Sequence, residues 1–242
     1  MKLLGLDLET TGLNVATDEI VEFGVIIYDV NLETIGTCAS YLVQPRKFDL
    51  MSVGEISGIS THAILEYGQT FQSVAEWVGV LVEECDFIVA HNGLAFDKPI
   101  LERQCQEYGV QFPAIPWIDT MIDVPYPDSI STRALVPLAA YHGFLNPFPH
   151  RALFDVMTML KILSLYDIHA IAETASTPVV WVRAKVSYDN RNLVKAQRFQ
   201  WDSNSKLWVK KIRQGKLLSE AAACKCELEI LPQSYIYGET LI

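Results

Sequence analysis

Two carboxylates stand close together near the start of the chain, on what reads as a buried strand. Asp7 and Glu9 follow the apolar pair Leu3-Leu4 and alternate with leucines in "GLDLETTGL". Because side chains of a strand alternate between its two faces, both acids point the same way, roughly 7 Å apart. Like charges this close on an apolar element are costly without a cation. The pair therefore predicts a cation-binding site.

Two further acids and a histidine extend this constellation. Asp97 lies at an expected strand-to-helix junction in "AHNGLAFDKPIL", and His150 precedes Asp155 by five residues in "PHRALFDV". Four converging acids repel one another unless divalent cations neutralise them, and oxygen ligands favour Mg²⁺ or Mn²⁺ over zinc. Two such ions, about 3.5 to 4 Å apart, clamp the attacking and departing oxygens of a phosphodiester displacement. A histidine nearby can take the proton of the attacking water, since its unperturbed pKa lies near neutrality.

Hydrophobic periodicity predicts the elements that position these residues. An antiparallel meander of three strands is expected near residues 2–9, 19–29 and 35–43. Helices and short strands then alternate, with helices near 70–84, 97–109, 131–142 and 151–166 and strands near 86–92 and 116–121. Residues 45–69 and 122–131 are expected to form long loops, and the helical pattern is expected to end near 167. This order predicts an α/β fold built on a mixed sheet.

The charge balance divides the chain into two parts. Residues 1–177 hold 8 Lys and Arg against 23 Asp and Glu, whereas residues 178–242 hold 11 against 6. Such asymmetry indicates two units with different roles. We expect a catalytic domain over residues 1–170 and a small basic α+β domain over residues 178–242. The second should contain a strand from about Val179, a helix, a hairpin, a last helix and a last strand.

The basic segment carries five aromatic residues, Trp181, Tyr188, Phe199, Trp201 and Trp208. Exposed aromatic rings can stack on unpaired bases while positive charge attracts phosphates, so one interpretation is a nucleic-acid-binding module. The other is that a domain this small needs its aromatics as core and its lysines as a solvated face. Both hold if core aromatics lie beneath a basic surface.

Composition narrows the class of protein. Half of the residues are hydrophobic, which is enough to bury a core and excludes a disordered chain. No apolar run reaches membrane length, and the start "MKLLGLDLET" turns acidic too early for a signal peptide. We expect a soluble cytoplasmic protein that does not associate with membranes.

Three stretches, taken together, resemble the exonuclease motifs of the DEDDh 3′-to-5′ exonucleases. They are Asp7–Leu13, Asn92–Asp97 and His150–Asp155. The third resembles the histidine form of the family, because the tyrosine form would need Tyr at 151, where Arg stands. This family includes the proofreading subunit of bacterial replicative polymerase, ribonuclease T and oligoribonuclease. The resemblance covers about residues 1–166 and implies a ribonuclease H-like fold, a mixed five-stranded sheet flanked by helices.

The resemblance also implies roles for individual residues. Asp7, Glu9 and Asp155 would hold one divalent cation, Asp7 and Asp97 would lie near a second, and His150 would be the general base. Six residues would contact the terminal nucleotide: Thr10, Thr11, Gly12, Leu13, Asn92 and Phe96. The first three would approach the 3′ end through their backbone. Leu13 would wedge against the last base, Phe96 would line the pocket and Asn92 would brace the strand end.

The leading hypothesis is an enzyme that removes nucleotides from the 3′ end of single-stranded DNA or frayed duplex ends. An exoribonuclease is the first alternative, because recognition of the 2′-hydroxyl depends on pocket detail that the motifs do not contain. A proofreading subunit that acts with a polymerase or another replication partner is the second.

Overall fold

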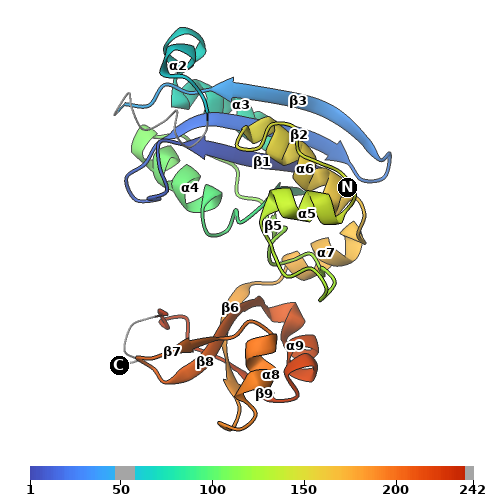
Figure 1. Ribbon diagram of the computed structural model, residues 1–242. Coiled ribbons are helices and arrows are strands. Elements are labelled where there is room, and N and C mark those ends of the chain that lie inside the picture. Colours follow the sequence, from blue (N-terminus) through green and yellow to red (C-terminus); the bar gives the residue numbers. More distant parts are fainter. Residues whose placement is uncertain (47–57, 238–242) are drawn as a thin grey trace. The chain divides into compact units, whose positions relative to one another are not determined.

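The computed structural model describes residues 1–46 and 58–237 of the 242-residue chain. They divide into two compact units, Met1–Ala172 and Glu173–Ile242. We call them unit 1 and unit 2 and describe each by itself (Figure 1). No helix within the described ranges has the length and hydropathy that crossing a membrane requires.

Unit 1 is built on a mixed five-stranded sheet with the strand order β3-β2-β1-β4-β5. Strands β1 (Lys2–Thr10), β2 (Ile20–Asp29) and β3 (Thr34–Leu42) form the predicted antiparallel meander. The short strands β4 (Phe87–Ala90) and β5 (Trp117–Asp119) continue the sheet in parallel beyond β1. The predicted fold class, a ribonuclease H-like mixed sheet with flanking helices, is confirmed.

Six helices of the described residues belong to the first part of the chain: α2 (Thr61–Tyr67), α3 (Phe71–Glu83), α4 (Asp97–Tyr108), α5 (Leu135–Tyr141), α6 (Ala152–Leu163) and α7 (Ile168–Ala175). Two of them correct the sequence-based expectations. Helix α2 lies in the stretch expected as a loop, of which residues 47–57 are outside the described residues, and α7 lies where the helical pattern was expected to end. Helix α2 buries only Ile64, so it offers too little periodicity to reveal itself.

The two faces of β1 have different partners, as alternation requires. Leu4, Leu6 and Leu8 join the main hydrophobic core, to which α3 contributes Phe71 and α4 contributes Ile100. The odd-numbered residues point to the opposite face, where α6 packs against the sheet. Asp7 and Glu9 therefore lie on the face of the sheet that α6 covers.

Unit 2 is a four-stranded antiparallel sheet with two helices. Its strand order is β7-β8-β6-β9, with β6 (Val179–Lys185), β7 (Gln200–Asp202), β8 (Leu207–Arg213) and β9 (Glu227–Ile230). Helices α8 (Arg191–Ala196) and α9 (Leu217–Cys224) and a short 3₁₀ turn (Gln214–Lys216) complete it. Val182, Ile212 and Leu228 pack against Val194 of α8 and Cys224 of α9, so the unit has a hydrophobic core of its own.

Candidate active site

Three carboxylates converge in unit 1. Asp7 and Glu9 of β1 and Asp155 in the first turn of α6 each offer one oxygen, and these oxygens all lie within 4.8 Å of one another. Glu9 is only 8% exposed, whereas Asp7 and Asp155 are partly accessible to solvent. The alternation of β1 brings the first two acids together, and packing of α6 on the sheet adds the third.

Asp97 approaches the same strand from the other helix layer. It is the first residue of α4 and is almost fully buried. Its Oδ1 accepts a hydrogen bond from the backbone N–H of Leu8 at 3.1 Å. Leu8 lies between Asp7 and Glu9 on β1, so this bond holds Asp97 beside the acid pair. The structure therefore brings all four predicted acids to one region.

Burial is the largest cause of a raised pKa at each of these four carboxyl groups. It raises the pKa of Glu9 to about 8, helped by repulsion from Asp155 and Glu22, and the pKa of Asp97 to about 7. The pKa of Asp7 lies well above its ordinary value, because burial is joined by repulsion from Asp97 and then Asp155. The pKa of Asp155 is raised as well. Each acid therefore resists ionisation chiefly because it is buried, and repulsion from other carboxylates adds to this effect.

This donor set fits a divalent cation. It is made of carboxylate oxygens alone, which suits Mg²⁺ or Mn²⁺ better than softer metals. A bound cation would also reverse the repulsion that raises the pKa values, since positive charge favours the ionised form of a nearby acid. Asp7, Glu9 and Asp155 are the residues placed to hold one ion, with Asp97 near Asp7.

His150 lies next to this cluster on the loop that leads into α6. Its backbone adopts a left-handed conformation with φ of 64°, and its N–H donates to Oδ2 of Asp155 at 3.0 Å. The residue is exposed. The hydrogen bond fixes the backbone of this loop to Asp155, so His150 lies beside the acid cluster in the fold.

Asn146 is a site residue that sequence reasoning missed. This buried side chain donates through Nδ2 to Oδ1 of Asp155, while its own Oδ1 accepts from the backbone N–H of Phe148 at 3.0 Å. Asn146 thus links the loop that carries His150 to the Asp155 carboxylate of α6. No sequence motif marks an asparagine nine residues before an aspartate, so no local signal could have revealed it.

Glu22 and Arg151 form a second contact that the motifs did not predict. Glu22 lies opposite Glu9 in the β1–β2 ladder and is fully buried. Its carboxylate pairs with the guanidinium of Arg151 at 3.0 Å and accepts the N–H of Ala152 at 3.2 Å. Because negative charge at a helix N-terminus is favourable, Glu22 anchors the start of α6 to the sheet. A glutamate on a strand full of apolar residues was the available signal.

Two glycines allow α6 to lie directly on the sheet backbone. A Cβ at Gly24, which pairs with Asp7 across the ladder, would lie 2.3 Å from the carbonyl carbon of Ala152. A Cβ at Gly5 would lie 2.7 Å from the Val156 side chain. Glycine at these positions sets the depth of α6, and with it the distance of Asp155 from β1.

Replacing Gly24 with alanine should therefore damage both stability and activity. The added methyl group meets backbone atoms, which cannot rotate away, so we expect a loss of roughly 1–3 kcal/mol in the free energy of unfolding. Because α6 must move and Asp155 moves with it, an activity that depends on the acid cluster should fall about 10²-fold or more. Gly36→Ala on β3 is the matched control, since its Cβ would meet its nearest atom, the Ile27 oxygen, at 3.8 Å. Equal activity of the two variants would contradict this account.

The loop after β1 carries the residues expected at the 3′ end, and Asp18 organises it. The hydroxyl of Thr10 donates to the Gly12 carbonyl at 2.6 Å, and the hydroxyl of Thr11 donates to Asp18 at 3.1 Å. A Cβ at Gly12 would lie 2.5 Å from Asp18 Oδ2, so a side chain at this position would displace the Asp18 carboxylate. Leu13 projects from this loop and is 77% exposed, a large apolar side chain left accessible at one end of β1.

The loop between β4 and α4 is shaped by Asp119 of β5. Asn92 has φ of 66° and donates its N–H to Oδ1 of Asp119 at 3.0 Å, while Leu94 donates to the other oxygen at 3.1 Å. The Asn92 carbonyl in turn accepts the N–H of Phe96, which is half-buried directly before Asp97. Asn92 and Phe96 thus belong to one ordered turn that delivers Asp97, and Asp119 is another positioning residue that the sequence did not reveal.

Two family models match separate parts of the chain. Residues 4–163 match the family model described as Exonuclease (RNase_T). Residues 180–223 match a model described only as a domain of unknown function. The exonuclease match thus contains all four acids and His150, and ends before unit 2 begins.

Two relatives each match about two thirds of the chain. A DNA polymerase III PolC-type of Mycoplasma pneumoniae is 30% identical over 170 residues, which are 66% of this chain but 11% of the polymerase. An oligoribonuclease of Corynebacterium glutamicum is 26% identical, over 68% of this chain and 78% of the relative. The chain therefore spans a small part of the polymerase and most of the oligoribonuclease.

Solved structures show the same fold. The nuclease domain of 3′hExo, a DEDDh family member bound to rAMP, is similar with a TM-score of 0.58 and 20% identity, over 68% of this chain and 90% of that one. E. coli ExoI in a complex with single-stranded DNA is similar with a TM-score of 0.64 and 14% identity, over 94% and 64%. With residues 4–163 matched by the exonuclease model, the chain belongs to the exonuclease family.

Proposed function

We propose that the chain is a metal-dependent 3′-to-5′ exonuclease that hydrolyses phosphodiester bonds at the 3′ end of single-stranded or frayed DNA. One observation carries the proposal: three carboxylate oxygens within 4.8 Å of one another, on the strand and helix of an exonuclease fold. Buried acids that repel each other at such distances are costly to stability, and a function that needs cations accounts for them.

The residues divide the chemistry between them. Asp7, Glu9 and Asp155 would hold one ion, and Asp7 and Asp97 a second. When bound, the two ions supply positive charge at the scissile phosphate and Lewis acidity toward water. His150 would accept the proton of the attacking water at a ring nitrogen, from the solvent side of the cluster. The backbone N–H of His150 and the side-chain amide of Asn146 would keep the Asp155 carboxylate oriented during this proton transfer.

The two ordered loops would receive the terminal nucleotide. Thr10, Thr11 and Gly12 would present backbone groups to the 3′ end. The contacts of Thr11 and Gly12 with Asp18 would hold this loop in position. Leu13, exposed beside them, would wedge against the last base. Phe96 would line the other side and Asn92 would brace that loop, in the turn that Asp119 holds.

DNA is the substrate we propose, and RNA is the alternative. The PolC-type polymerase and the ExoI complex with single-stranded DNA support DNA. The oligoribonuclease and the rAMP complex of 3′hExo support RNA. The match to the polymerase also supports the second alternative, in which the chain acts with a replication partner, although the match spans only 11% of that polymerase.

An end-labelled assay on DNA and RNA oligonucleotides of the same sequence tests the proposal. A 5′-labelled DNA strand should be shortened from its 3′ end into a ladder when Mg²⁺ or Mn²⁺ is present, and EDTA should abolish the ladder. DNA should be cleaved faster than RNA. A faster rate on RNA would transfer the proposal to the exoribonuclease. Cleavage that persists in EDTA would contradict the metal requirement.

A further inference from the structure

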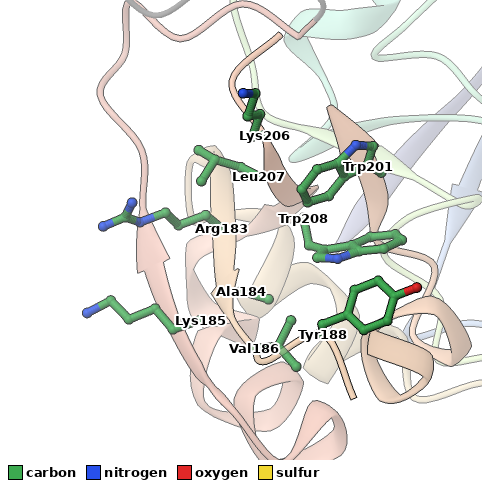
Figure 2. Close-up of a pocket in the computed structure, with 9 residues that line it drawn as sticks. All are labelled: Arg183, Ala184, Lys185, Val186, Tyr188, Trp201, Lys206, Leu207 and Trp208. Atoms are coloured by element: carbon green, nitrogen blue, oxygen red, sulfur yellow. The ribbon is translucent and has the colours of Figure 1, made fainter. Parts of the chain in front are cut away.

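A pocket of about 370 Å³ opens in unit 2 where two of its strands separate (Figure 2). The ladder between β6 and β8 ends with the pair Arg183 and Val209, although β6 continues to Lys185 and β8 starts at Leu207. Beyond this pair, β6 remains paired with β9 and β8 with β7 but not with each other, and the pocket lies there, beside the small side chain of Ala184. The pocket is therefore part of the sheet architecture rather than a gap between surface side chains.

Three aromatic rings form one side of this pocket. Figure 2 shows Trp208 between Trp201 and Tyr188. The indole centroids of Trp201 and Trp208 are 5.4 Å apart at an angle of 56°. Trp208 belongs partly to the core, but Trp201 is 47% exposed and Tyr188 is 76% exposed. Exposed aromatic surface of this size in a small unit with its own core is an unused binding surface.

Positive charge surrounds the rings. Arg183, Lys185 and Lys206 line the pocket, and Figure 2 shows the head groups of Arg183 and Lys185 pointing away from the aromatic side. Both pair with acids of β9, Lys185 with Glu227 at 2.7 Å and Arg183 with Glu229 at 2.8 Å. The Lys185–Glu227 pair is exposed and the Arg183–Glu229 pair is partly so, and ion pairs that solvent reaches are weak enough to exchange for other anions.

Two more cations lie over the rings themselves. The guanidinium of Arg191 lies 3.7 Å from the centroid of Tyr188, and the ammonium of Lys195 lies 5.5 Å from that of Trp208. The residues around the pocket thus combine five basic side chains with the two acids of β9. A polyanion with flat apolar groups matches such a surface in both charge and shape.

We infer that this pocket binds unpaired bases of single-stranded nucleic acid, with bases stacked on Trp201 and Tyr188 and phosphates beside the basic side chains. An acidic peptide would satisfy the charges but offers few flat groups for the rings. Such binding would keep a long strand tethered to the chain while its 3′ end is processed, a consequence that rests on the proposed function.

Binding of a single strand by the full chain tests this inference without catalysis. The probe is a fluorescent thirty-nucleotide dT strand, titrated in EDTA with Asp7→Asn protein so that no strand is cut. In that background we compare Trp201→Ala, Tyr188→Ala and Trp201→Phe. Tyr67→Ala is the matched control, since it removes an exposed tyrosine of α2 that is far in sequence from the residues of the pocket. A second probe with the same phosphates but no bases separates stacking from charge.

Trp201→Ala and Tyr188→Ala should each raise the Kd for dT by about 5- to 100-fold, the usual effect of losing a stacked base. Trp201→Phe should recover most of the affinity, Tyr67→Ala should change nothing, and the baseless strand should respond to none of them. Unchanged dT affinity in both alanine variants, with unfolding temperatures intact, would overturn the inference. So would an equal loss on the baseless strand, or a loss seen only with a polyglutamate probe. Stacking without any nuclease activity would leave this inference standing and remove the proposed function instead.

Discussion

Asp7→Asn should abolish exonuclease activity and at the same time stabilise the metal-free protein. Activity falls because Asp7 is the residue proposed to serve both cations, whose contribution to the transition state is several kcal/mol, so we expect a loss of roughly 10³-fold or more. Stability rises because the asparagine removes a carboxyl group whose ionisation is opposed by burial and by four neighbouring acids. The two changes go in opposite directions, which no simple unfolding effect can produce.

The stability half of this prediction depends on pH. Burial raises the folded-state pKa of Glu9 from 4.5 to about 8 and that of Asp97 from 3.8 to about 7. Between the unfolded and folded pKa values the native state binds more protons than the unfolded state, so the free energy of unfolding decreases as pH rises. The metal-free wild type should therefore lose stability from about pH 5 to pH 8, and Mg²⁺ or Mn²⁺ should restore it.

Thermal unfolding in EDTA at pH 5 and pH 8 measures this effect. At pH 8 we expect Asp7→Asn to unfold roughly 3–10 °C above wild type, and at pH 5 the two should nearly coincide. Asp128→Asn makes the same chemical change at an exposed carboxylate and should alter neither activity nor unfolding temperature. A variant at position 7 that stays active, or that is less stable than wild type at pH 8, would show that the acids do not repel one another as described.

His150→Ala should slow cleavage by roughly 10² to 10⁴-fold, the range for loss of a general base. The variant should fold normally, because His150 is exposed and its structural contact is made by the backbone N–H. Added imidazole should restore part of the rate, because it can accept the proton in place of the missing ring. Metal dependence should persist, since the four carboxylates are intact.

His62→Ala is the matched control for this variant. His62 is an exposed histidine of α2 that pairs with Glu66, and its loss should leave the rate unchanged. If His150→Ala keeps its full rate and its pH profile, another group takes the proton and His150 serves only to shape the loop.

The sequence predicted those parts of the site that depend on local pattern. Alternation placed Asp7 and Glu9 on one face opposite Leu6 and Leu8, and the structure has them so. The motifs predicted that Asp97 and Asp155 join the same site, and the mixed five-stranded sheet followed from the family resemblance. Local periodicity and spacing are enough where an element is long and regular.

The residues that support the site could not be predicted, because their partners are distant in sequence. Glu22 meets Arg151 and Ala152 across about 130 residues, and Asp119 holds the turn at Asn92 from the neighbouring strand. Such pairs exist only once the sheet and α6 have packed. Helix α7 was missed for a related reason, since a short helix depends on the core it packs against rather than on a visible pattern of its own.

The aromatic residues of the basic segment are partly core and partly exposed, so each of the two interpretations holds for some of them. Phe199 is buried and Trp208 packs partly into the core of unit 2, as the core interpretation required. Tyr188 and Trp201 remain exposed, as the other interpretation required. Composition alone could not separate them, because burial of an aromatic residue depends on which face of a strand or loop it occupies.

The packing of α6 against Gly5 and Gly24 restricts which substitutions this protein can accept during evolution. At Gly24 the spacing of the proposed catalytic acids is set by contact with main-chain atoms of α6, which are the same in every variant, and at Gly5 it is set by contact with the Val156 and Leu160 side chains. Substitutions elsewhere in the apolar interior can therefore accumulate with little effect on the reaction, whereas one carbon atom gained beneath α6 alters the spacing itself. Variation among homologous chains should be broad around this helix and nearly absent at the two positions on which it rests.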